Sequence, residues 1–264
     1  MKRVLITGGP TNEYIDEVMK ITNMSTGKIA VQLAALFARG GYNVTLCLTK
    51  GIKPEMFERS FSQLDNITVL PFETTQQLME TLQSAAAMYE YDIVIQSAAV
   101  ADYKPDFSFR AEDMAKEISS WIEKEARVIA EGYCQRDIYN AIFNMLTNPD
   151  CKVNDQTKIS SVEPNLTVKL GLTPKIIGHL REWFPNAYIC GFKLLENVTK
   201  EELIEAATKQ VQKCKTNLCF ANDLADLRRG DANRYVVTAT GYHDIRVDGA
   251  EGIYNLLNII TQTT

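Results

Sequence analysis

This sequence lacks several of the features by which common classes of protein are recognised. Its six cysteines contain no C-x-x-C pair, so reduced thiols are expected rather than a zinc site or a disulfide framework. Its only histidines, His179 and His243, stand without metal-ligand spacing and are given no catalytic role. The formal net charge of −5 argues against the basic surface that binds nucleic acid. A local site can still bind a small anion, whatever the net charge.

Leader and repeat signals are also missing. The first seven residues enter a strand-like stretch directly, without the apolar core and small-residue cleavage site of a secretory signal. The sequence shows no internal repeat and no low-complexity segment. These absences lead us to expect a cytoplasmic protein with neither a membrane nor a nucleic acid as its partner.

What the sequence does contain is a regular alternation of strand-like and helix-like segments. Short apolar stretches predict strands at 2–9, 40–49, 67–72, 91–101, 165–170, 187–192, 216–222 and 233–240. Helical spacing and capping residues predict helices at 25–39, 74–90, from 173, 199–214 and from 249. Such β-α-β repetition predicts a doubly wound, Rossmann-like α/β fold with a mainly parallel sheet and ligands at the carboxyl ends of its strands.

Residues 106–157 interrupt this alternation. Two helical pieces, about 111–129 and 136–146, follow one another without a strand between them, and a polar stretch comes next. A break of this length within an alternating fold is typical of a flap or small subdomain. We therefore expect one α/β domain over residues 1–264, with 106–157 as an inserted helical flap.

The stretch ITNMSTGKIA, residues 21–30, places polar and small residues where a helix is about to begin. It fits neither a dinucleotide-binding G-x-G-x-x-G loop nor a P-loop, and TGGPTNE after the first strand also lacks the dinucleotide spacing. Its ingredients still suit an anion, because helix N-terminal amides, small residues and hydroxyl and ammonium donors meet there. Alternatively, Ser25 only caps the helix and Lys28 is a solvated first-turn residue.

Seven motifs occur in order along nearly the whole chain outside 106–157: GGPTNEYID, ITNMSTGKIA, SAAVADYKP, KISS, LTPKII, GFKLL and FANDL. Together they resemble phosphopantothenoylcysteine synthetase, the nucleotide-dependent ligase of coenzyme A biosynthesis. Each motif is weak alone, and their shared order carries the resemblance. The chain has no room for the flavin-dependent decarboxylase domain fused to many bacterial synthetases. It therefore resembles the stand-alone form, with a separate decarboxylase as its pathway neighbour.

The resemblance implies a ligase that works in two steps. The carboxylate of 4′-phosphopantothenate attacks the α-phosphate of a nucleoside triphosphate, which releases pyrophosphate and leaves an acyl-nucleotide. The amine of L-cysteine then displaces the nucleoside monophosphate and forms the amide. The implied metal is Mg²⁺ carried by the triphosphate, with no ligand assigned to the protein, and the implied assembly is a homodimer.

The resemblance also implies roles for particular residues. Asn23 would donate an amide hydrogen bond to the phosphopantothenate portion or the acyl-nucleotide. Lys158 of KISS would approach the carboxylate or phosphates from a closing flap. The other implied contacts with substrate or nucleotide are at Gly9, Ser25, Thr26, Gly27, Lys28, Ala98, Ala99, Asp102, Lys193, Asn222 and Asp223.

Several of these assignments have a plainer alternative. Asp102 fits a turn before the next tyrosine, and Lys158 fits an exposed loop. Asn222 and Asp223 fit a pair that ties loops together. Phe192 is expected in the core rather than against a nucleotide base.

The motif KISS departs from many bacterial members, which have a lysine-x-lysine-lysine sequence at this place. Ser160 and Ser161 stand there instead, and this serine pair and GFKLL look more like the eukaryotic enzymes, which are associated with ATP. The rest of the chain resembles bacterial members. CTP is therefore the expected nucleotide, and ATP is the alternative.

Two other classes of function use the same kind of sheet. A short-chain NAD(P) reductase needs a glycine fingerprint and a Tyr-x-x-x-Lys pair, whereas Tyr103 is followed directly by Lys104. A nucleotide-binding regulatory module without catalysis stays open, because a fold does not fix a function.

Overall fold

The computed structural model describes residues 1–132, 134–153, 159 and 164–262. The chain divides into two compact units, and each is described by itself. The first unit consists of Met1–Thr11, Thr22–Ala101 and Pro174–Thr264, and the second consists of Asn12–Ile21 and Asp102–Thr173. The expected insertion at 106–157 thus falls inside the second unit. That both units belong to one domain stays a prediction.

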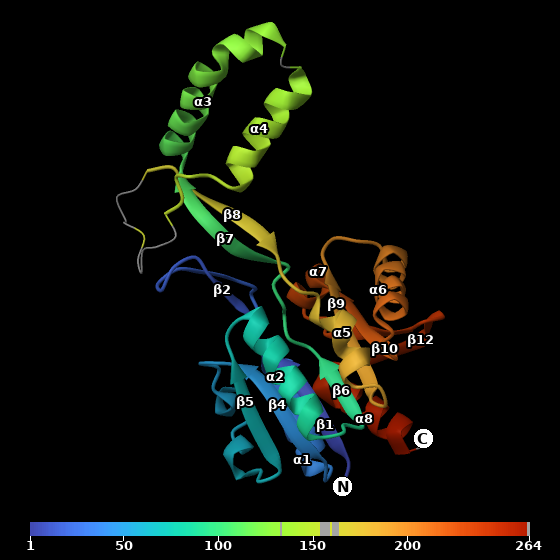
Figure 1. The fold of residues 1–264 in the computed structure, drawn as a ribbon. Helices are drawn as coiled ribbons and strands as arrows, with labels where there is room; N and C mark the ends of the chain where they lie inside the picture. The colour runs from blue at the N-terminus through green and yellow to red at the C-terminus, as the bar shows by residue number, and fades with distance from the viewer. Residues whose placement is uncertain (133, 154–158, 160–163, 263–264) are drawn as a thin grey trace. The chain divides into compact units, whose positions relative to one another are not determined.

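Within the described residues, the first unit is built on an eight-stranded sheet in the order β12-β11-β10-β9-β6-β1-β4-β5 (Figure 1). The strands are β1 Arg3–Gly8, β4 Asn43–Thr49, β5 Ile67–Phe72, β6 Ile93–Gln96, β9 Tyr188–Leu195, β10 Leu218–Asp223, β11 Asn233–Thr238 and β12 Gly241–Asp248. The strands from β5 to β10 are parallel, whereas β11 and β12 pair antiparallel. The predicted α/β fold with a mainly parallel sheet is confirmed.

The order of the parallel strands fixes where a ligand would meet the sheet. Numbered along the chain, these strands lie in the order 3-2-1-4-5-6, the order of dinucleotide-binding folds. The direction of winding reverses between the neighbouring strands β1 and β6. Because the connections after these two strands leave toward opposite faces, a crevice is expected outside their carboxyl ends.

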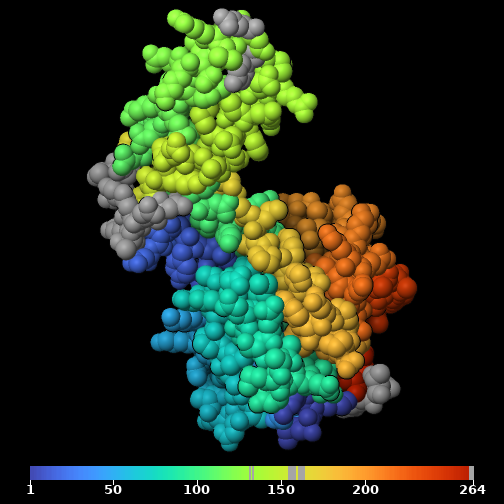
Figure 2. All heavy atoms as spheres, in the orientation of Figure 1, coloured from blue at the N-terminus to red at the C-terminus, as the bar shows by residue number. Residues whose placement is uncertain are grey.

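Helices cover both faces of the sheet. One face carries α1 (Lys28–Arg39) and α8 (Gly249–Gln262), which pack against each other. The other face carries α2 Thr75–Met88, α5 Ile176–Trp183 and α6 Lys200–Cys214. In the space-filling view of Figure 2, the side chains of α2 and α5 hide the strands behind them. The remaining elements are the short helix α7 Leu224–Arg228 and the 3-10 turns η1 Pro54–Met56 and η2 Phe61–Gln63.

Two of these helices begin at the threonines that the sequence offers as caps. Thr74 accepts the amide of Gln77 at the start of α2, and Thr199 accepts the amide of Glu202 at the start of α6. In both cases the third helical residue reaches back to the cap and completes a capping box. A cap of this kind contributes about 1 kcal/mol to stability.

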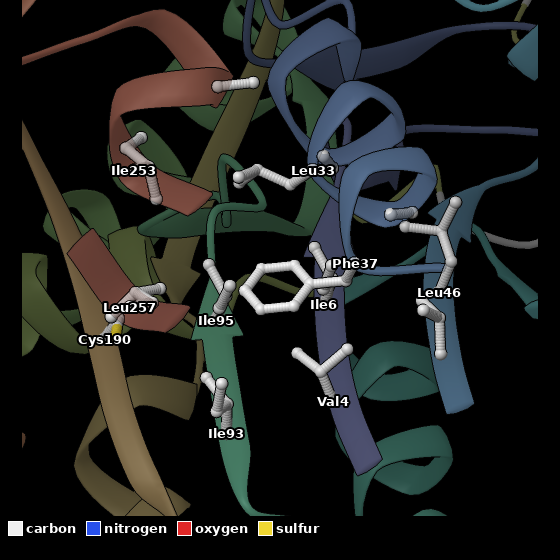
Figure 3. Packing of buried hydrophobic residues seen from close by; sticks show 14 of the residues in the cluster. Val4, Ile6, Leu33, Phe37, Leu46, Ile93, Ile95, Cys190, Ile253 and Leu257 are labelled. Atoms are coloured by element: carbon white, nitrogen blue, oxygen red, sulfur yellow. The ribbon is translucent and has the colours of Figure 1, made fainter. Parts of the chain in front are cut away.

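The main core lies between the sheet and the pair formed by α1 and α8 (Figure 3). Ile6 of β1 and Ile95 of β6 face Phe37 of α1, and α8 adds Ile253 and Leu257. All five side chains are fully buried. Since each contributes about 1.5–3 kcal/mol on burial, this packing fixes α1, and therefore its N-terminus, against the end of β1.

The second unit combines a β-ribbon with a helical hairpin. β7 Tyr103–Arg110 pairs antiparallel with β8 Leu166–Leu172, and α3 Ala111–Glu131 packs beside α4 Gln135–Thr147. A further short pair joins β2 Asn12–Tyr14 to β3 Lys20–Thr22. Phe107, Phe109 and Met114 form a small core under the hairpin.

The two helices predicted in the insertion are confirmed: α3 begins at the predicted residue and ends two residues later, and α4 is longer by one residue at each end. The strand predicted at 165–170 exists as β8, but it does not continue the main sheet, because its partner is β7. Its sequence alternates apolar and polar residues, and its residues are only partly buried. That pattern is typical of a ribbon open to solvent, whereas a strand inside a parallel sheet has a continuous apolar run.

The cysteines follow the prediction of reduced thiols, since all six are free in the structure. Burial raises the pKa of Cys47 and of Cys219 to about 12, and it raises the pKa of Cys190 well above its usual value. Cys134 is exposed. We therefore expect Cys134 to react with a thiol reagent at pH 8 within minutes and these three buried cysteines only after unfolding, because the thiolate is the reacting species. Timed alkylation followed by peptide mass spectrometry tests this, and rapid labelling of Cys190 in the folded protein would contradict it.

Among the helices that the structure describes, none is both long enough and apolar enough to span a bilayer.

Candidate functional site

Hydrogen bonds join the loops at the carboxyl ends of β1 and β6. The amide of Ala99 donates to the carbonyl of Gly9 (2.9 Å), and the amide of Thr11 donates to the carbonyl of Ala99 (3.2 Å). The amide of Ala98 donates to Oγ1 of the buried Thr7 (3.1 Å). The alanine motif after β6 is therefore held in register with the glycine motif after β1.

Gly9 and Gly27 bring the start of α1 close to this pair of loops. Both have left-handed backbone conformations, with φ of +84° and +73°. A Cβ at Gly9 would lie 2.3 Å from Oγ1 of Thr49, and one at Gly27 would lie 3.3 Å from the amide nitrogen of Gly9. Glycine is therefore needed at these two positions both for the conformation and for the space.

α1 begins without a side-chain cap. Its N-cap residue is Gly27, so the helix starts at Lys28 rather than at Ser25, and the alternative role of Ser25 as the cap is wrong. Thr26 Oγ1 accepts the amide of Lys28 (3.3 Å), and the first turn contains no acidic residue. No carboxylate of that turn therefore neutralises the positive end of the helix dipole. The start of α1 is thus suited to binding an anion.

Asn23 links two of the sequence motifs. Its exposed side chain donates from Nδ2 to the carbonyl of Ala99 (3.1 Å). The carboxamide is thereby held beside the loop after β6. Because Nδ2 carries two hydrogens, this contact leaves one donor for a ligand.

A pocket of about 530 Å³ opens at this edge of the sheet. Its walls come from the loop before α1, the loop after β6, and residues of β9, β10 and β11. Seven of the predicted site residues line it: Ser25, Thr26, Gly27, Lys28, Ala98, Ala99 and Asn222. Asn23 and Gly9 do not line the pocket, but both are hydrogen-bonded to Ala99 in its wall.

The charge of the pocket has one sign. Among the described residues that line it, Lys28 and Arg234 are positive and none is negative. The amides at the start of α1 add partial positive charge at the same wall. The pocket is therefore suited to an anionic ligand.

Sequence reasoning missed Arg234 and assigned Phe192 only half of its role. Phe192 does pack against Phe220 of the core, with 5.3 Å between ring centroids, but it also lines the pocket. The guanidinium carbon of the half-buried Arg234 lies over the ring of Phe192, 5.9 Å from its centroid. A signal for Arg234 was present in NRYVV, because it is a charge two residues before the buried Val236, on the same side of a strand.

Lys193 and Asp223 lie at the ends of β9 and β10, but they do not line the pocket. Side chains alternate along a strand, so Lys193 faces the α6 side of the sheet while Phe192 faces the pocket. The carboxylate of Asp223 accepts the amides of Val198 (3.1 Å) and Ala225 (2.6 Å). These bonds, that of Val198 first, hold the pKa of Asp223 below its usual range. The ligand contacts predicted for Lys193 and Asp223 stay predictions.

Two further predicted residues cannot be placed at this pocket. Asp102 belongs to the second unit, where its carbonyl accepts the amide of Thr173 (3.1 Å). Lys158 lies outside the described residues, as do Ser160 and Ser161. Ile159 is described, and it is buried with its amide donating to Oδ2 of Asp16 (2.9 Å). The motif GGPTNEYID thus holds the residue next to Lys158 through its final aspartate.

A larger hollow of about 660 Å³ lies beside α2, β4 and β5, but none of the predicted site residues lines it. Its described lining combines Arg3 with Asp65 and Glu80, so its charged residues favour an anion less than those of the smaller pocket do. Nowhere in the described part of the chain do three or more His, Cys, Asp or Glu residues come together as metal ligands. The pocket at the ends of β1 and β6 is therefore the candidate site.

The strand order and this pocket define an α/β domain of the Rossmann type with a pocket at the topological switch point, where such folds bind their ligands. Comparison with known proteins makes the class more specific. Residues 1–128 match the family model described as the DNA/pantothenate metabolism flavoprotein C-terminal domain. Residues 1–128, just under half of the chain, are therefore similar to this domain.

Individual relatives agree with this family. The coenzyme A biosynthesis bifunctional protein CoaBC of Thermococcus kodakarensis is 30% identical over 223 residues, which are 84% of this chain and 41% of that protein. The crystal structure of the DNA/pantothenate metabolism flavoprotein from Streptococcus pneumoniae is 28% identical, with a TM-score of 0.72 over 100% of this chain and 99% of that one. A Cab2 mutant in complex with phosphopantothenate-cysteine shares the fold at 19% identity, with a TM-score of 0.61 over 99% of this chain and 85% of that one. The chain spans less than half the length of the first two curated relatives that it matches.

Proposed function

We propose that this protein is a phosphopantothenate–cysteine ligase of coenzyme A biosynthesis, which joins 4′-phosphopantothenate to L-cysteine through an acyl-nucleotide. The observation that carries the proposal is the convergence of ITNMSTGKIA, SAAVADYKP and FANDL on one cation-lined pocket at the switch point of the sheet. The match of residues 1–128 to the family model and the likeness to CoaBC add support.

The pocket residues would contribute by positioning and by neutralising charge. The carboxylate attacks the α-phosphate and expels pyrophosphate, and the cysteine amine then attacks the acyl carbon and expels the nucleoside monophosphate. Lys28 and the amides at the start of α1 would bind phosphate oxygens. The small side chains of Ala98 and Ala99 would allow a ligand to approach the backbone closely. The remaining donor of Asn23 would hold the oxygen on which charge develops.

The nucleotide we propose is CTP, with ATP as the alternative, because the sequence outside KISS and GFKLL resembles bacterial members. Mg²⁺ would reach the site on the triphosphate, whose oxygens supply its ligands, and would neutralise phosphate charge there. We further propose that the protein acts as a homodimer, the commonest assembly of soluble enzymes.

The test is a reconstituted reaction with 4′-phosphopantothenate, L-cysteine, Mg²⁺ and either CTP or ATP. We expect pyrophosphate, nucleoside monophosphate and the amide in equal amounts, and only when the phosphorylated acid is present. The ratio of product formed with CTP to that formed with ATP decides the nucleotide. Nucleotide binding without turnover would favour the regulatory module instead, and a change in nicotinamide absorbance would favour the reductase.

A further inference from the structure

Arg234 has a positive charge that no carboxylate of the described chain pairs. Its Nη1 donates to the carbonyl of Ala232 (2.9 Å), while its Nε is buried and has no hydrogen-bond partner in the described structure. The charge of Asp248 acts on it without forming an ion pair. Burial lowers the pKa of Arg234, which reflects a guanidinium that has lost much of its contact with water.

A buried, unpaired guanidinium lowers the stability of a protein in which it has no function. Removing a charge from water without pairing it costs free energy, and replacement by a neutral residue would remove that cost. Arg234 also lies in a pocket whose described lining contains no acid. The group that pairs this guanidinium is therefore expected to come from outside the chain and to be an anion.

Asn222 gives a second, independent indication at the same place. It is only 5% exposed, it lines the pocket, and its Nδ2 has no hydrogen-bond partner among the described residues. The last pair in the antiparallel register of β10 and β11 is Ala221 with Tyr235, and continuing this register by one position places Asn222 opposite Arg234. Cross-strand neighbours lie within about 5.5 Å between their Cβ atoms. Two unsatisfied donors, one of them charged, thus occupy neighbouring positions in one pocket wall.

We propose that Arg234, with Asn222 beside it, binds a phosphate group of a substrate in this pocket. A guanidinium offers several donors in a planar fork that matches the oxygens of a phosphate, and the neutral amide adds one more. The identity of the substrate rests on the proposed function, in which the acid and the nucleotide both carry phosphate. The shared ligand chemistry is the phosphate, and the experiment separates its two sources.

The experiment measures binding by calorimetry to the wild type and to Arg234→Gln. One arm compares 4′-phosphopantothenate with pantothenate, and the other compares CTP and ATP with cytidine and adenosine. We expect the variant to bind one phosphorylated ligand about 10- to 100-fold more weakly, as for the loss of a charged hydrogen bond, and to bind its unphosphorylated counterpart unchanged. The arm in which the loss appears identifies the source of the phosphate.

Arg246→Gln is the matched control. Arg246 lies on the neighbouring strand β12, where its guanidinium already pairs with Asp231 (3.2 Å) and does not line the pocket. This variant should bind all the ligands as the wild type does. The proposal is overturned if Arg234→Gln binds both phosphorylated ligands within about twofold of the wild type, or if the unphosphorylated ligands weaken as much. If Arg234→Gln does not fold, Asn222→Ala replaces it as the test. We expect Asn222→Ala to bind one phosphorylated ligand selectively more weakly, and unchanged binding of both phosphorylated ligands by this variant overturns the proposal.

The binding arms do not depend on turnover, so this proposal and the ligase can fail separately. If Arg234→Gln selectively loses phosphate binding but the wild type never releases pyrophosphate, the role of Arg234 stands and the ligase assignment is wrong. If the wild type forms the amide and Arg234→Gln binds the phosphorylated ligands as the wild type does, the ligase assignment stands and the proposed role of Arg234 is wrong.

Discussion

Asn23→Asp should lower the rate of amide formation by about 10²- to 10³-fold, the usual effect of losing one preorganised donor at a reacting oxygen. In the folded protein Nδ2 of Asn23 donates to the carbonyl of Ala99 and keeps a second hydrogen for the ligand. Aspartate replaces this donor with an anion, which repels both that carbonyl and any phosphate in the pocket. The measurement is the rate of product formation at saturating substrates, alongside the midpoint of thermal unfolding.

Asn186→Asp is the control for the added charge. Asn186 is an exposed residue in the turn before β9, and it does not line the pocket. Its substitution should leave the rate unchanged. Because Asn23 is itself exposed, its own substitution should change the free energy of unfolding by no more than about 1 kcal/mol. Loss of stability in proportion to loss of activity would mean that Asn23 acts by holding the loops together and not on the substrate.

Gly8→Ala should destabilise the protein by about 3 kcal/mol, because it overpacks the contact between β1 and α1. A Cβ at Gly8 would lie 2.2 Å from Cβ of Ala30, far inside the sum of their radii. Neither group is the end of a flexible side chain, so relief requires a shift of α1. Since α1 carries Gly27 and Lys28 at its start, activity should fall together with the free energy of unfolding, measured by urea denaturation.

Ala30→Gly in the Gly8→Ala background tests the cause directly. It removes the clashing group, so the double variant should be more stable than the sum of the two single changes predicts. Gly178→Ala is the matched control, because a Cβ at this position in α5 would meet nothing within 4 Å. That change should stabilise the protein by about 0.5–1 kcal/mol through helix propensity. Additive effects of Gly8→Ala and Ala30→Gly would show that the helix contact is not the origin of the loss.

The parallel sheet was predictable because the sequence of each strand shows that the strand is buried. Strands such as β1 and β6 are buried on both faces, and their runs of apolar residues show this without knowledge of their neighbours. The start of α1 was less predictable, since Ser25 and Thr26 both resemble caps while Gly27 takes the position through its left-handed conformation. Backbone conformation at a single residue depends on what packs around it, here the loop at Gly9.

The partner of a strand was not predictable from its own sequence. β8 was expected in the main sheet and pairs instead with β7, a strand that was not expected at all. Proline at 105 and charged residues in β7 weaken its strand signal, and only the pairing with β8 satisfies its backbone. Strand pairing depends on two segments that are distant in sequence, so the sequence of one strand alone does not predict its partner.

The sequence by itself determined that this is an α/β protein and which motifs would meet, because the carboxyl ends of parallel strands share one edge of a sheet. Only the tertiary structure decided which side chains at that edge face the pocket. Strand alternation turns Phe192 toward it and Lys193 away, and the register of β10 and β11 brings Arg234 to Asn222. The physical reason is that burial and charge pairing at a site are set by neighbours remote in sequence, whereas strand and helix signals are set by residues close in sequence.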